Sequence, residues 1–199
     1  MRKLGVLVLL ALFTLTGCQS GTSEPTSSAT PTAEPSATET ATAAPLEYTV
    51  PASCDLPSML RVIEDLGFTD SEDVTPPWDP ANGTDLKIAL DNGGLACAWG
   101  PYGTDVGVVV YWVKLTGTIW EDAKQIWLAD GEQLIDIPGL DEDEAYFVYS
   151  PAGGDYEWAR WEANARFGDL WVQVGTSSFV EPDAANTVFE EALKLASKN

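Results

Sequence analysis

Val106-Gly107-Val108-Val109-Val110-Tyr111-Trp112-Val113 is the strongest strand signal in this chain of 199 residues. β-Branched and aromatic side chains favour the extended backbone of a sheet. The run is apolar almost throughout and does not alternate with polar residues, which is typical of a strand whose two faces are both covered. We therefore predict a central strand over residues 106–113.

Shorter strand signals flank this run on both sides. Residues 86–90 and 95–99 are apolar except for Lys87 and surround Asp91-Asn92-Gly93-Gly94, a sequence that favours a tight hairpin turn. Towards the C-terminus we predict strands over 145–149, 157–165 and 170–175, the first two joined across residues 151–155.

Three segments have the 3.6-residue periodicity of helices. The first opens at Asp55-Leu56-Pro57 and stops at Gly67; the second opens at a capping box, Thr118-x-x-Glu121, and stops at Gly131; the third follows Pro182. The order of elements predicts an α+β fold: an antiparallel sheet with three helices, in two successive helix-plus-strands halves.

The N-terminal residues have the pattern of a secretory signal. Arg2 and Lys3 precede twelve uncharged, mostly apolar residues, too few to span a bilayer as a helix. The ending Leu15-Thr16-Gly17-Cys18 resembles the lipobox of bacterial lipoproteins, whose cysteine receives a diacylglyceryl group and becomes the mature N-terminus. An ordinary signal with a chance cysteine is the alternative.

This interpretation divides the chain into three parts. Residues 1–17 would be the lipoprotein signal peptide, 18–45 the lipidated Cys18 with a disordered Ser/Thr/Pro/Ala tether, and 46–199 a single extracytoplasmic domain. The tether has no Leu, Ile, Val or aromatic residue to bury. We expect the domain at the outer face of the cytoplasmic membrane, anchored through the lipid on Cys18, in the cell-wall space.

Two cysteines, Cys54 and Cys97, remain after lipidation. In an oxidising compartment an even pair usually forms a disulfide, so we predict that they pair with each other. Two free buried thiols are the alternative.

Charge and composition exclude several function classes. The net charge is −21, of which residues 1–45 contribute −1, so the predicted domain carries about −20 and would repel nucleic acid. The chain has no histidine, which excludes Ser-His-Asp and Cys-His catalysis and the common zinc sites. We identify no catalytic residue and expect neither a metal nor a cofactor.

Paired carboxylates are the one enzyme signal left, because glycosidases use two carboxyl groups across a sugar. The candidates Glu121 with Asp122, and those in the run 141–144, are better explained as a helix N-terminus and a solvated loop. Residues 70–73 and 141–144 lack the spacing of a calcium loop.

The aromatic residues suggest a ligand surface. Alternation along 157–165 and 170–175 places Trp158, Arg160, Trp171 and Gln173 on one side of two neighbouring strands, opposite a core-facing side that includes Trp161. Two tryptophans beside amide and guanidinium donors suit stacking on a sugar ring or an aromatic partner. The alternative is that a loop or helix covers this face. The remaining tryptophans that we assign are predicted to be core: Trp99, Trp112, Trp120 and Trp127.

The chain as a whole resembles cell-envelope lipoproteins of actinobacteria that carry an uncharacterised extracytoplasmic α+β domain. The matching pieces are the lipobox, the tether, Cys54-Asp55-Leu56, Cys97-Ala98-Trp99, Ile137-Pro138-Gly139-Leu140 leading to Ala145-Tyr146, and the closing helix. The resemblance implies the Cys54–Cys97 bridge and no catalytic residue.

The function that we predict is therefore an anchored binding or accessory domain, with cell-wall glycan or an envelope protein as its partner. A wall-glycan hydrolase and a scaffold subunit without a small ligand are the alternatives.

Overall fold

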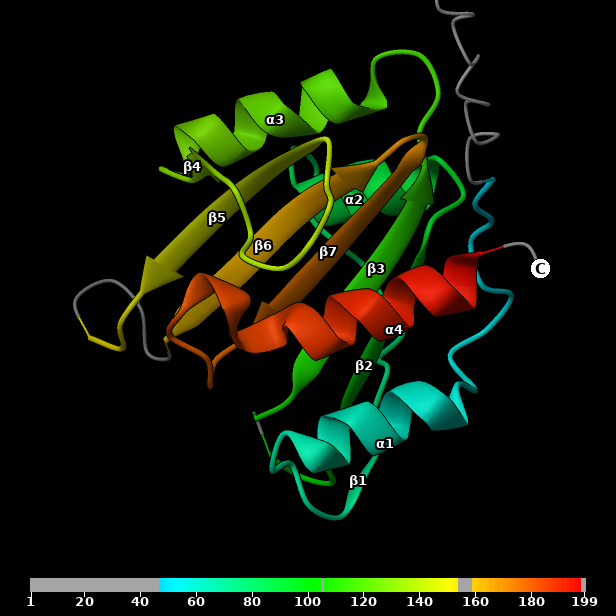
Figure 1. Cartoon of the computed structure of the whole chain (residues 1–199), viewed down its shortest axis with the longest axis vertical. Helices are drawn as coiled ribbons and strands as arrows, with labels where there is room; N and C mark the ends of the chain where they lie inside the picture. The colour runs from blue at the N-terminus through cyan, green and yellow to red at the C-terminus, as the bar shows by residue number, and fades with distance from the viewer. Residues whose placement is uncertain (1–46, 105, 154–158, 198–199) are drawn as a thin grey trace, which may run out of the picture. The chain divides into compact units, whose positions relative to one another are not determined.

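The computed structural model describes residues 47–104, 106–153 and 159–197, in which one antiparallel sheet of seven strands is central. Its strands are β1 (Ser71–Asp73), β2 (Leu95–Pro101), β3 (Val108–Lys114), β4 (Gln133–Ile135), β5 (Glu144–Ser150), β6 (Arg160–Phe167) and β7 (Leu170–Thr176). They lie in the order β1-β2-β3-β7-β6-β5-β4 (Figure 1). The predicted α+β class with an antiparallel sheet is confirmed.

Strand β3 is central, as its apolar run predicts. It pairs with β2 on one side and β7 on the other. Val110 and Trp112 point to one face of the sheet, Tyr111 and Val113 to the other, and all four are buried. Residues from opposite faces are buried alike because helices cover both sides.

Helices α1 (Pro57–Asp65) and α4 (Asn186–Ala196) cover one face. In Figure 1, α4 crosses in front of the sheet. Pro182 begins a short 3₁₀ turn, Pro182–Ala185, that leads directly into α4. Both helices contribute apolar side chains to a large core with β2, β3, β6 and β7: Met59, Ile63, Val188, Phe189, Ala192 and Ala196.

Helices α2 (Asp85–Asp91) and α3 (Ile119–Ala129) cover the other face, which we call the α2/α3 face. A second core lies beneath them, made largely of aromatic side chains: Tyr111, Trp120, Trp127, Tyr146 and Trp171. The helices described thus number four, where the sequence predicted three.

The prediction of a strand over residues 86–90 is wrong, because this segment is helix α2. Thr84 caps the helix by accepting a hydrogen bond from the backbone N–H of Lys87 at 3.2 Å. The following glycine, Gly93, has a φ of 77° and ends the helix instead of turning a hairpin. A run of five residues that is apolar except for Lys87 fits either element, and here the cap decides between them.

Two further details differ from the prediction. The capping box at α3 does not form: the Thr118 hydroxyl donates to Asp122 Oδ2 at 2.8 Å and caps no backbone N–H. Strands β1 and β4, of three residues each, were not predicted, because edge strands this short carry little periodicity.

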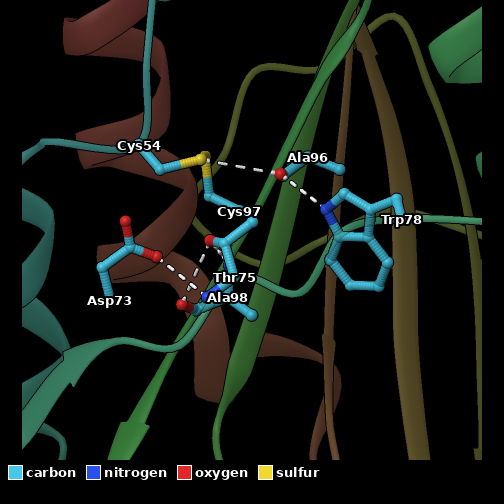
Figure 2. Close-up of a disulfide and its surroundings, with 7 residues drawn as sticks. All are labelled: Cys54, Asp73, Thr75, Trp78, Ala96, Cys97 and Ala98. Atoms are coloured by element: carbon cyan, nitrogen blue, oxygen red, sulfur yellow. Dashed lines mark hydrogen bonds between the residues drawn. A yellow bond between two sulfur atoms is a disulfide. The ribbon is translucent and has the colours of Figure 1, made fainter.

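A disulfide joins Cys54 to Cys97, as predicted, and connects the segment before α1 to strand β2. Figure 2 shows the carbonyl of Ala96 between this disulfide and the indole of Trp78. The indole Nε1 donates a hydrogen bond to Ala96 O at 2.8 Å. The loop that carries Trp78 is therefore attached to the strand next to the disulfide.

Candidate functional site: a cleft on the α2/α3 face

Three successive rows of residues cross the α2/α3 face on strands β3, β7 and β6. They are Val109, Gly175 and Glu162; Tyr111, Gln173 and Asn164; and Val113, Trp171 and Arg166. Helix α3 covers the third row, where Trp120 and Trp127 pack edge-on against the Trp171 ring at 6.2 and 5.1 Å between centroids.

The first row is not covered in this way and lies in the lining of a cleft of about 960 Å³. The cleft is also lined by the loop before α2, through Trp78 and Pro80, and by the first turn of α2. Gly175 has no side chain between Val109 and Glu162, and the amide of Gln173 lies over this position. A Cβ atom added at Gly175 would lie 2.9 Å from Nε2 of Gln173, so a larger residue would displace that amide.

Asp85 lies at the boundary between the cleft and the second core. Its Oδ2 accepts hydrogen bonds from the Tyr111 hydroxyl at 2.7 Å and from the Trp127 indole at 3.0 Å. Its Oδ1 accepts from the backbone N–H of Leu86 at 2.7 Å. These three donors hold a carboxylate between α2, α3 and β3.

Arg160 is shared among several carboxylates beside the cleft. Its Nε donates to Glu162 Oε2 at 3.1 Å, and one of its terminal nitrogens lies 3.3 Å from Glu132 Oε1. The same guanidinium is 3.8 Å from Asp130 Oδ2. Glu132, in the connection between α3 and β4, is 3% exposed and also accepts from the Asn164 amide at 3.1 Å.

One guanidinium cannot neutralise all of these carboxyl groups. The pKa values of Glu132 and Glu162 are raised as a result of their burial and of the negative charges around them. Burial, followed by the charge of Glu162, raises the pKa of Glu132 to about 8. Burial and the neighbouring Asp85 carboxyl raise the pKa of Glu162 to about 7. Burial and Asp85 also raise the pKa of Tyr111 well above 10. The cluster therefore retains a proton near neutral pH.

In the second row, Gln173 has a buried polar atom that lacks a hydrogen-bond partner among the described residues. The side chain is 4% exposed and lies in the cleft lining. Among the described residues, its Oε1 has no hydrogen-bond partner. A buried acceptor without a partner costs about 1–3 kcal/mol, so this atom favours a ligand that donates to it.

The described residues of the predicted ligand surface lie in different environments. Arg160 and Gln173 both line the cleft, on the side of the strands that alternation predicted. Trp171 is fully buried because helix α3 covers the face at this row, so for this residue the alternative of a covered face holds. Trp158 lies outside the described residues. The tryptophans predicted to be core are buried, and so is Trp161.

Sequence reasoning missed Trp78 and Asp85. Trp78 lies in the run Pro76-Pro77-Trp78-Asp79-Pro80. The prolines around this tryptophan could have indicated that its side chain is held in a fixed position. Asp85 was missed because residues 86–90, which follow it, were assigned to a strand, and the helix start that positions Asp85 was therefore not recognised.

Within the described ranges, no group of three or more histidine, cysteine or acidic side chains is arranged to hold a metal ion. None of the helices in those ranges is long and apolar enough to cross a bilayer. Comparisons with protein-family models, with curated proteins and with solved structures found no match.

Proposed function

We propose that the chain is a lipid-anchored extracytoplasmic protein whose folded part binds a small ligand in the cleft of the α2/α3 face. The observation that carries this proposal is the side chain of Gln173, buried in the cleft lining with an unpartnered Oε1. Ligand sites are concave, with aromatic walls and a few convergent polar groups. The cleft combines Trp78 with Gln173, Arg160 and Glu162 in this way.

The cellular setting of the proposal comes from the sequence. The lipobox ending in Cys18 and the tether over residues 19–45 would place the cleft in the cell-wall space, anchored to the outer face of the cytoplasmic membrane. Fragments of wall glycan or a side chain of an envelope protein are the partners available there.

Native mass spectrometry tests the binding function. The purified protein is incubated with the low-molecular-weight fraction of a muramidase-digested cell envelope and sprayed under non-denaturing conditions. We expect an adduct of defined mass on the wild type that is lost from Trp78→Ala and from Gln173→Leu. Gln133→Leu is the matched control, because Gln133 is an exposed glutamine on β4. An adduct that is equally abundant on all four proteins contradicts a ligand in this cleft.

A glycan hydrolase that uses two carboxyl groups is the second candidate, favoured by the pKa of Glu162, about 7, in the cleft. Glycosidases hold their two carboxyl groups about 5 to 10 Å apart. The carboxyls of Asp85 and Glu162 are instead close enough to share a hydrogen bond. Asp85 also accepts hydrogen bonds from three donors of the protein itself, which supports a binding role over a catalytic one.

Release of reducing sugar ends from purified cell wall distinguishes the two candidates. We expect the same background rate with the wild type and with Glu162→Gln. A rate that is well above background for the wild type and lost in the variant would establish the hydrolase instead.

A further inference from the structure

We infer that the ligand of this cleft is an organic cation, whose ammonium group lies between the carboxyl of Glu162 and the side-chain oxygen of Gln173. The inference rests on the proposed function and deepens it by naming the chemical class of the ligand.

The first step is the imbalance of charge around the cleft. Of the described residues that line it, Asp85, Arg160 and Glu162 are charged, and Arg160 is the one cation. Its guanidinium already lies within 4 Å of three carboxylates, those of Asp130, Glu132 and Glu162. Arg160 neutralises these carboxylates only in part, so a second positive charge in the cleft would be attracted to them.

The second step is the unpartnered oxygen of Gln173. Gln173 and Glu162 lie on neighbouring strands, with Gly175 directly opposite Glu162. The missing side chain at Gly175 leaves room for the amide of Gln173, whose Nε2 lies over this glycine beside Glu162. An ammonium has three donors and no acceptor, so it would satisfy Gln173 Oε1 and the carboxyl of Glu162 together.

The aromatic wall of the cleft and the negative net charge of the chain also favour a cationic ligand. Tryptophan is the best aromatic partner for a cation, and Trp78 lies in the lining with its indole N–H already bound to Ala96 O. The chain carries a net charge of −21, which raises the local concentration of cations and repels anions. An anionic ligand would meet Asp85 and Glu162 at close range.

Binding of a cation is expected to change the protonation of Glu162. Glu162 is faced by Asp85 from α2, Tyr111 from β3, Arg160 on its own strand and Glu132 from the connection between α3 and β4. Burial and Asp85 hold part of its population protonated near pH 7. A bound ammonium favours the carboxylate, so protons are released when the ligand binds.

Isothermal titration calorimetry with two matched probes tests the inference. Cadaverine and 1,5-pentanediol have the same carbon chain and differ in charge, and N-acetylglucosamine serves as a neutral sugar. We expect cadaverine to bind at least about tenfold more tightly than either neutral probe, as one hydrogen bond to a charged group provides. We also expect its binding enthalpy at pH 7 to depend on the ionisation enthalpy of the buffer, because protons are released.

Two variants locate the site. Glu162→Gln and Gln173→Met should each weaken cadaverine binding at least about tenfold, while Glu190→Gln, an exposed glutamate on α4, should not. Gln173→Met keeps the volume of the side chain, so it tests the site even if the first variant folds poorly. Near-ultraviolet circular dichroism checks that the aromatic core is intact.

Failure of this inference is distinguishable from failure of the proposed function. Equal or tighter binding of pentanediol or N-acetylglucosamine overturns the cationic ligand and leaves a binding cleft. Absence of cadaverine binding at millimolar concentration also overturns it, whatever the envelope extract yields. Cadaverine binding that survives both variants places the cation elsewhere and overturns the assigned site.

Discussion

At the scale of single residues, Trp171 shows that alternation along a strand predicts a side but not its exposure. The indole is fully buried, and its Nε1 donates to Asn164 Oδ1 at 3.0 Å. Tyr111 and Trp127 pack against the ring at 5.2 and 5.1 Å between centroids. We therefore expect Trp171→Ala to lower the free energy of unfolding by about 3–5 kcal/mol, as truncation of a buried tryptophan does. Urea unfolding followed by circular dichroism measures this change.

Tyr102→Ala is the control for that measurement, because Tyr102 is 84% exposed at the end of β2. Its free energy of unfolding should stay within about 0.5 kcal/mol of the wild type. Similar small losses in both variants would mean that α3 does not cover the third row.

The buried carboxyl of Glu132 predicts a dependence of stability on pH. Burial raises its pKa from 4.5 to about 8 in the folded protein, so between these values the folded state binds more protons than the unfolded state. Its contribution to stability is therefore full below about pH 4.5 and is lost as the pH rises towards 8. Replacement by an uncharged amide, Glu132→Gln, removes this loss.

We expect stability to fall less steeply with pH in Glu132→Gln than in the wild type, by at most about 1.4 kcal/mol per pH unit. Urea unfolding at intervals from pH 5 to pH 8 measures the two slopes. Glu190→Gln, whose side chain is exposed, should keep the wild-type slope. Parallel curves for the wild type and Glu132→Gln would show that Glu132 is ionised throughout, through its pair with Arg160.

At the scale of elements, two threonines at helix starts differ in what their side chains do. Thr84 caps α2 by accepting from the N–H of Lys87, whereas Thr118 at α3 bonds only to the exposed side chain of Asp122. We expect Thr84→Ala to cost about 1 kcal/mol and Thr118→Ala less than about half of that. Thermal or urea unfolding of the two variants compares them, and a reversed order would contradict the assigned caps.

The same elements show how much of the fold the sequence could predict. The long apolar run of β3 and the periodic faces of α1 and α4 are strong signals because burial alone determines them. The prediction of a strand over residues 86–90 failed because a run this short, apolar except for Lys87, is compatible with both periods. The hydrogen bond from Lys87 N to Thr84, which decides for the helix, depends on a backbone angle that residue types do not fix.

The site was predictable only in part, for a related reason. Alternation placed Arg160 and Gln173 on one side of β6 and β7, and both line the cleft. Their environment depends on α2 and α3, which arrive from far away in the chain. Helix α3 buries Trp171, and the loop before α2 positions Trp78. Both are tertiary contacts, which leave no periodic signal in the sequence of the strands.

At the scale of the whole molecule, the two faces of the sheet have different roles. The face under α1 and α4 is an apolar core beside the Cys54–Cys97 bridge. The α2/α3 face combines a smaller aromatic core with the buried carboxyls, Arg160 and the cleft. Polar groups thus gather on the face whose helices leave part of the sheet uncovered, which is where a ligand can reach them.

Anchoring of the whole chain is tested at Cys18. Its thiol is the acceptor that the lipobox ending predicts, and each buried methylene of an attached acyl chain contributes about 0.8 kcal/mol to membrane binding. We expect labelled palmitate to be incorporated into the wild type and to be absent from Cys18→Ala, which should leave the membrane fraction. The double variant Cys54→Ser with Cys97→Ser is the matched control, since it removes the other two thiols and should remain labelled. Equal labelling of Cys18→Ala and the wild type would end the lipoprotein interpretation and leave the ordinary secretory signal as the explanation of residues 1–17.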